Sequence, residues 1–174
     1  MKQQDRNKAW GFTLFADDLR VEVAGKVSLM GLYQADMLFP SNLNFPISVS
    51  KFCMLVMYYE ISGVITDDIT FKVTLADLPE PLVEFNMPRK DLLEQVQVVQ
   101  RPDLEALPDE QERIFHSRIP IALSPLNLPK AGRLRVRAHY SDGSILKLGS
   151  ISVRQVELDE FNKMVGMAAI PPTK

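Results

Sequence analysis

The stretch that decides the fold is Trp10–Tyr33, which reads WGFTLFADDLRVEVAGKVSLMGLY. From residue 15 to residue 23 the odd positions are apolar, apart from Asp17, and the even positions 18, 20 and 22 are charged. The apolar alternation returns from residue 27 to residue 33. A period of two predicts strands with one buried face, so this stretch is expected to form a β-hairpin.

The register of this hairpin follows from keeping the apolar side chains on one face. A two-residue loop would mix the faces, whereas a three-residue loop over residues 23–25 sets Val21 against Val27. That loop also places Gly25 at the left-handed position that three-residue hairpins require. The same register predicts the pairs Glu22 with Lys26, Leu19 with Leu29 and Asp17 with Gly31.

The register places the two neighbouring acids, Asp17 and Asp18, on opposite faces of the strand. Asp17 has the parity of the apolar side chains, and an unpaired carboxylate in a core is costly. We therefore expect Asp17 to be a structural carboxylate that points at the core and accepts hydrogen bonds. Asp18 shares the parity of Arg20 and is expected to face solvent, where it is free to contact a partner.

The rest of the chain extends the all-β pattern. The run FCMLVMYYEI within Ile47–Ile61 is apolar on both parities, so both faces of this strand need a cover. Leu158, Phe161, Val165 and Ala168 recur at helical spacing and predict a short amphipathic helix, a candidate for that cover. Further strands are expected at Ile69–Leu75, Leu82–Asn86, Ile114–Ala122, Gly132–Tyr140 and Ser144–Val153.

The last two of these strands form a second hairpin with a three-residue loop that ends at Gly143. This loop pairs Ala138 with Leu146 and Val136 with Leu148. The segment 102–112 between earlier strands is acidic and proline-bracketed, which is typical of a solvated surface excursion.

Together these elements predict an antiparallel β-sandwich, immunoglobulin-like or related, of about seven to nine strands. The sandwich domain is expected over residues 10–156, after a polar tail at 1–9 and before a helix and tail at 157–174.

The length, net charge and cysteine count of the chain exclude several classes of protein. A chain of 174 residues with net charge -2 is the size of one domain and has no global attraction to nucleic acid or anionic membrane. Its single cysteine, Cys53, cannot form an internal disulfide, and no apolar run reaches the ~20 residues of a membrane helix. We expect a cytoplasmic protein in a reducing compartment.

Motifs for catalysis are missing from the sequence. It contains no HExxH, CxxC, P-loop, GxGxxG or GxSxG, and both His116 and His139 fall in predicted strands. We therefore expect no enzyme, no cofactor and no metal site. The strongest charged feature is the alternation of Arg133, Arg135 and Arg137, which suits phosphates or carboxylates, or is an ordinary solvated face neutralised by nearby acids.

Residues 15–33 resemble a family of small bacterial proteins of unknown function. The matching residues are Phe15, Asp17-Asp18, Arg20, Glu22, Gly25-Lys26, Ser28-Leu29, Gly31 and Tyr33. The later run LPKAGR, residues 128–133, is similar to the start of that family's C-terminal hairpin. The resemblance implies an all-β intracellular domain and supplies no catalytic residues.

The sequence therefore favours a non-enzymatic protein-interaction or structural module of a bacterial or phage-derived assembly. Its partner is expected to be a protein or a second copy, not nucleic acid or a membrane. The alternative is a domain that binds Ca²⁺ or a phosphate-bearing ligand through the acidic pair and the arginines. Expected contact residues are Asp18, Arg133, Arg135, Arg137, Phe161 and Val165, and expected structural residues are Asp17, Gly25, Gly31 and Gly143.

Overall fold

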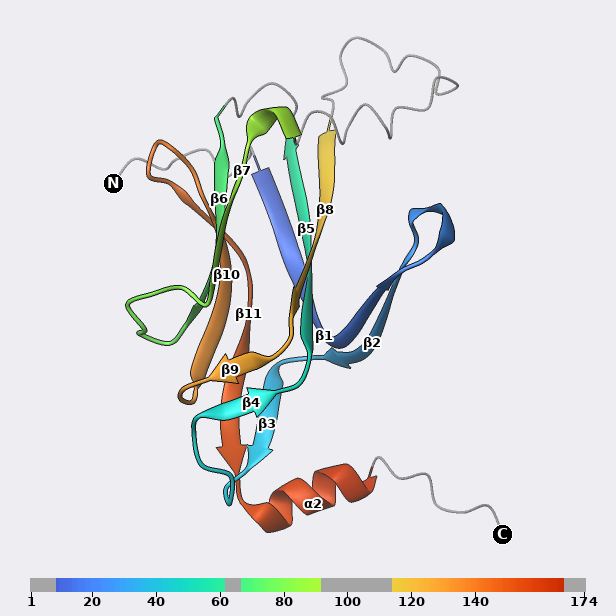
Figure 1. Cartoon of the computed structure of the whole chain (residues 1–174), viewed down its shortest axis with the longest axis vertical. Helices are drawn as coiled ribbons and strands as arrows, with labels where there is room; N and C mark the ends of the chain where they lie inside the picture. Colours follow the sequence, from blue (N-terminus) through green and yellow to red (C-terminus); the bar gives the residue numbers. More distant parts are fainter. Residues whose placement is uncertain (1–8, 62–66, 92–113, 168–174) are drawn as a thin grey trace.

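A computed structural model describes residues 9–61, 67–91 and 114–167 of the chain. These residues form two β-sheets packed face to face, with a two-stranded sheet and one α-helix at one end (Figure 1). The predicted all-β sandwich is confirmed. The expected acidic excursion at 102–112 lies outside the described residues.

Sheet A contains four antiparallel strands in the order β2-β1-β5-β8. Its long central strands pair over most of their length, from Ala9 opposite Glu60 to Ala16 opposite Cys53. The strand bounds are β1 (Ala9–Val21), β2 (Val27–Tyr33), β5 (Phe52–Ile61) and β8 (Ile114–Leu123).

Sheet B contains five strands in the order β3-β11-β10-β6-β7. Its strand β3 runs parallel to β11, whereas the sequence predicts an antiparallel sandwich and no strand in this segment. A pairing between two segments so far apart in the chain cannot be inferred from the alternation of apolar and polar residues in either strand. The strand bounds are β3 (Asp36–Pro40), β6 (Ile69–Leu75), β7 (Val83–Met87), β10 (Gly132–His139) and β11 (Ile145–Val156).

The small third sheet pairs β4 (Ile47–Val49) with β9 (Leu126–Leu128). The expected continuous strand over 47–61 is therefore wrong, because the chain leaves the strand conformation around Ser50 and Lys51 before β5 begins. With these short strands the described residues contain eleven strands, more than the sequence predicts.

The core lies between the two sheets and is built from alternate residues of the long strands, and in β11 the buried positions change from Leu148 to Ile151 and Val153. On β6 the burial alternates strictly, so that Phe71, Val73 and Leu75 are fully buried between half-buried neighbours. Each such side chain contributes roughly 1.5–3 kcal/mol by leaving water. Sheet A supplies the opposing layer, which includes the fully buried Phe52, Met54, Val56 and Tyr58.

Both predicted hairpin loops are confirmed, with one difference in register. Val21 pairs with Val27 and Ala138 pairs with Leu146, and Gly25 and Gly143 have φ of 69° and 80°. The predicted pairing of Val136 with Leu148 is wrong, because a β-bulge between β10 and β11 sets Val136 opposite Gly149.

The helix α2 (Leu158–Met167) forms as predicted but does not cover the doubly apolar strand. It lies against β3 at the end of the sandwich (Figure 1). Only Glu157 separates it from β11, so it cannot reach back to the outer side of β5. Phe161 is half-buried, and the side chain of Val165 lies outside the described residues.

Candidate functional site

The opening hairpin divides into a part within sheet A and a part that leaves it. Because β1 pairs with β5 only up to Ala16, residues 17–32 extend from the body of the sandwich (Figure 1). We call these residues the arm. The arm bends towards the outer side of sheet A (Figure 1), and Asp17 and Val21, which continue the core parity of β1, are exposed.

Asp17 lies opposite Gly31, as the register predicts, and accepts a hydrogen bond from the Tyr33 hydroxyl. A side chain at Gly31 would collide with this carboxylate, and Gly31 has φ of 67°. Burial, and then the Asp17 carboxylate, raise the pKa of Tyr33. The expectation that Asp17 points at the core is wrong, because the arm carries it away from the sandwich and leaves it exposed.

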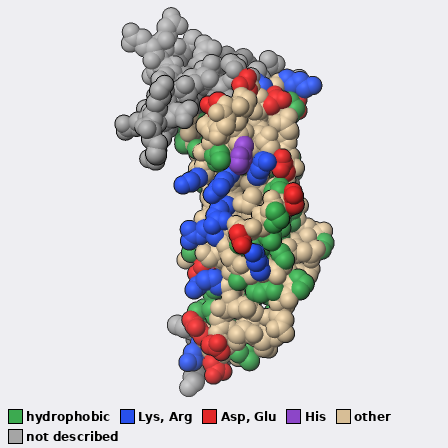
Figure 2. All heavy atoms as spheres, turned by 90° about the vertical axis from the view of Figure 1, so that its left-hand side faces the viewer, with side chains coloured by type: hydrophobic (Ala, Val, Ile, Leu, Met, Phe, Trp, Pro, Cys, Tyr) green, Lys and Arg blue, Asp and Glu red, His purple; other side chains and the backbone are tan. Residues whose placement is uncertain are grey.

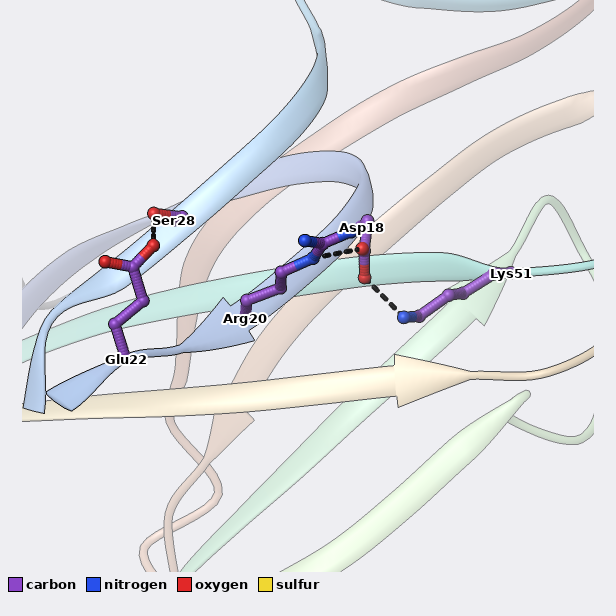
Figure 3. A network of polar contacts seen from close by, with 5 residues as sticks. All are labelled: Asp18, Arg20, Glu22, Ser28 and Lys51. Atoms are coloured by element: carbon purple, nitrogen blue, oxygen red, sulfur yellow. Dashed lines mark hydrogen bonds and ion pairs between the residues drawn. The ribbon is translucent and has the colours of Figure 1, made fainter.

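Asp18 is already engaged within the chain (Figure 3). Its carboxylate forms ion pairs with Lys51, which directly precedes β5, and with Arg20, whose Nε lies 3.0 Å from Oδ2. Lys51 and then Arg20 hold the pKa of Asp18 below its usual value. The expectation that Asp18 is free for a partner is therefore wrong, and the residue instead links the arm to the start of β5.

Three rings stack across the outer side of sheet A. Trp10 on β1 stacks on Tyr59 of β5 with centroids 5.7 Å apart, and Tyr59 stacks on His116 of β8 at 4.6 Å. Phe12 lies on the same parity of β1 and is 47% exposed, while Trp10 is 41% exposed. We call Trp10, Phe12, Tyr59 and His116 the aromatic face.

The arm adds exposed apolar side chains beside the aromatic face. Met30 and Leu32 on β2 are 49% and 54% exposed, and Val21 and Val23 near the tip are more exposed still. Leu32 pairs with Ala16, which shares the parity of Trp10 and Phe12. We did not predict this surface from the sequence. The signal for it was that β1 and β2 carry apolar residues at both odd and even positions, so that both faces of the hairpin are partly apolar.

The three arginines of β10 lie on the outer side of sheet B. The residues that alternate with the arginines along β10 are fully buried, namely Leu134, Val136 and Ala138. The side chains of Arg133, Arg135 and Arg137 therefore point away from the core. Asp17 and Asp18 lie on the arm, which extends from sheet A. The structure therefore does not bring together the two halves of the alternative ligand site.

A buried polar network that the sequence did not predict lies inside the sandwich. The Glu60 side chain is fully buried, forms an ion pair with Arg89, and accepts a hydrogen bond of 2.7 Å from the Tyr58 hydroxyl. The Tyr140 hydroxyl lies 3.4 Å from that of Tyr58, and the Arg89 guanidinium lies 5.7 Å from the centre of the Phe115 ring. Burial raises the pKa of both tyrosines.

The signal for this network was Glu60 itself, a single charge at the end of an otherwise apolar strand. Such a residue needs a partner when the strand is covered on both faces. Its partner comes from the segment just after β7, and nothing in the local pattern points to it.

Within residues 9–61, 67–91 and 114–167, no three His, Cys, Asp or Glu side chains gather in a way that would hold a metal ion. No helix in that part of the chain is long and apolar enough to cross a membrane. No family model matches the chain, and neither a curated protein nor a solved structure matches it significantly. The resemblance of residues 15–33 to a bacterial family stays a prediction.

Proposed function

We propose that the protein is a non-enzymatic interaction module that associates with a second copy of itself through the aromatic face and the arm. The observation that carries this proposal is that Trp10, Phe12, Met30 and Leu32, which share one parity of β1 and β2, are all exposed. Contiguous exposed apolar side chains of this size mark interaction surfaces on soluble proteins.

The residue types support a protein as the occupant. Trp, Tyr, Phe and Met are enriched at protein interfaces, and Trp and Tyr are the commonest residues to dominate binding energy. Trp10 and Tyr59 are already held against each other by stacking, with an angle of 6° between their rings. Little side-chain freedom is therefore lost when this pair is covered.

Two features support a second copy in particular. Each chain carries an arm with exposed apolar side chains and an exposed apolar sheet face, so two copies supply both elements. We call Trp10, Phe12, Met30 and Leu32 the patch. Aromatic side chains bury about 150–250 Å² each, Met and Leu bury somewhat less, and all four side chains of the patch are roughly half exposed. The patch therefore offers roughly 400 Å² per copy, about half of the ~800 Å² per partner in a standard interface and enough for its apolar centre.

The test is the mass in solution of the wild type and of two variants. The double variant Phe12→Ser, Leu32→Ser removes apolar side chains from the patch without opening the core, since both are about half exposed. The control is Ile145→Ser, which removes an apolar side chain of 49% exposure from the outer side of sheet B.

We expect light scattering to give a mass above the 19.7 kDa monomer for the wild type and for the Ile145→Ser control, and a monomer for the double variant. A wild type that stays monomeric over the accessible concentration range would contradict the proposal. An oligomer that survives in the double variant would do the same.

A further inference from the structure

The outer side of sheet B concentrates positive charge. β10 lies between β6 and β11, and its outward residues Arg133, Arg135 and Arg137 form a row along the strand. Figure 2 shows Lys and Arg side chains gathered in a band along this side, with a histidine near one end. We call the outward side of β6, β10 and β11 the basic face.

The sheet topology adds a cation from β6 to the second hairpin, whose register already places Lys147 beside the arginines. Arg137 lies directly opposite Lys72 on β6 and opposite Lys147 on β11. Three cations therefore stand in one row across three strands, with neighbouring strands about 4.8 Å apart. Like charges directly opposite each other destabilise a sheet, so this row costs the fold stability.

Little of this charge is neutralised within the described part of the chain. Lys72 pairs with Glu84 at 3.1 Å, and Arg135 donates to the backbone carbonyl of Ala76. No ion pair among the described residues involves Arg133, Arg137 or Lys147. After burial, Lys72 and Arg137 are the main causes that lower the pKa of the nearby His139.

The spacing of the arginines matches an extended polypeptide. Alternate residues of a strand lie about 6.8 Å apart on one side, and the same spacing holds for the carboxylates of an extended segment with an acid at every second position. Arginine binds carboxylates through two parallel hydrogen bonds. Hydroxyl donors from Thr74, Ser150 and Ser152 stand opposite Arg135 and Arg133 on the flanking strands.

Two observations favour an acidic protein segment over a nucleic acid. Apart from the His139 imidazole near one end, the outward positions of the three strands of the basic face carry no aromatic side chain, so a row of bases would find only one ring to stack on. The chain as a whole has net charge -2, which opposes the long-range attraction that dominates binding to nucleic acids.

We propose that the basic face binds an acidic protein segment in an extended conformation, with carboxylates at every second residue meeting Arg133, Arg135 and Arg137. This goes beyond the proposed self-association, because it uses the opposite sheet and a different kind of partner. The two proposals therefore fail independently.

The test uses fluorescence anisotropy with the full chain and three labelled probes. One peptide alternates Glu with Thr, the second has the same composition with its glutamates in one block, and the third probe is a short duplex DNA of equal charge. The variant is Arg133→Glu, Arg137→Glu, with the milder Arg133→Gln, Arg137→Gln in case the first does not fold. The matched control is Lys90→Glu, Lys163→Glu, whose side chains are exposed and lie outside both the basic face and the arm.

We expect the alternating peptide to bind most tightly of the three, and salt to weaken this binding. The arginine variants should lose at least about tenfold in affinity, and the lysine control less than about twofold. On binding, NMR should show the pKa of His139 rise, while that of His116 on the other sheet stays unchanged.

Four results would overturn the proposal, and the first three concern the comparison between probes and variants. They are equal affinity for the two peptides, tighter binding of the DNA, and unchanged binding by the arginine variants. Absence of any salt-dependent binding of the alternating peptide would overturn it as well.

Discussion

Replacing Arg89 with Ala should destabilise the fold far more than removal of any surface charge. The Glu60 side chain has no exposure and the Arg89 side chain is 12% exposed, so the pair is largely shielded from water. Arg89→Ala leaves the Glu60 carboxylate buried, without its cation and with the hydrogen bond from the Tyr58 hydroxyl. Breaking a buried pair in this way costs about 3–5 kcal/mol.

That cost is a large fraction of the roughly 5–15 kcal/mol by which a domain is stable. The change is measured by urea denaturation followed by circular dichroism, as a shift of the transition midpoint. The control is Lys72→Ala, whose pair with Glu84 is 30% and 45% exposed and is worth about 0–1 kcal/mol.

A second variant shows whether the loss of stability comes from the unpaired Glu60 carboxylate. Glu60→Gln replaces the carboxylate with a neutral amide, so the double variant Glu60→Gln, Arg89→Ala should be more stable than Arg89→Ala alone. The reasoning is refuted if Arg89→Ala costs no more than the Lys72 control. It is also refuted if the two changes are additive, because residues that share an ion pair must show coupling.

Two further predictions concern the arm. Gly31→Ala should destabilise the fold by about 1–3 kcal/mol, because it forces a side chain into the Asp17 carboxylate at a positive φ. Gly25→Ala has open space around it and φ of 69°, so it should cost only about 1 kcal/mol. Thermal or urea unfolding measures both changes. NMR titration should give Asp18 a pKa below 3.8 that returns towards 3.8 in Lys51→Met. Since the folded pKa is the lower one, the stabilisation by Asp18 is complete above pH 3.8 and is lost as the pH falls through the folded value, and a Lys51→Met protein with unchanged acid sensitivity would argue against the ion pair.

Side-chain parity was enough to predict the local pairing of strands. The loops that end at Gly25 and Gly143 follow from it, because a slip by one residue would turn every apolar side chain of the strand to the other face. Parity does not say where a strand stops belonging to the sheet. Asp17 has core parity yet is exposed, because β1 loses its pairing with β5 after Ala16.

The features that sequence reasoning missed depend on contacts between distant segments. The row of Arg137 with Lys72 and Lys147 exists only because β10 lies between β6 and β11. The bulge opposite Val136 shifts the register of β11 from Gly149 onwards, so that Ser150 and Ser152 lie opposite Arg135 and Arg133, and no turn residue in the sequence indicates it. The Glu60–Arg89 pair likewise joins two elements whose local patterns give no sign of each other.

The most direct test of the proposed association uses the single tryptophan of the chain. Trp10 lies on the aromatic face and is 41% exposed, so its fluorescence reports whether that face is covered. We predict that raising the protein concentration shifts its emission to shorter wavelength and protects it from iodide quenching, in step with the mass from light scattering. We predict no such change in the Phe12→Ser, Leu32→Ser variant. A Trp10 that stays equally quenchable while the wild type self-associates would contradict the assignment of the aromatic face as the contact surface.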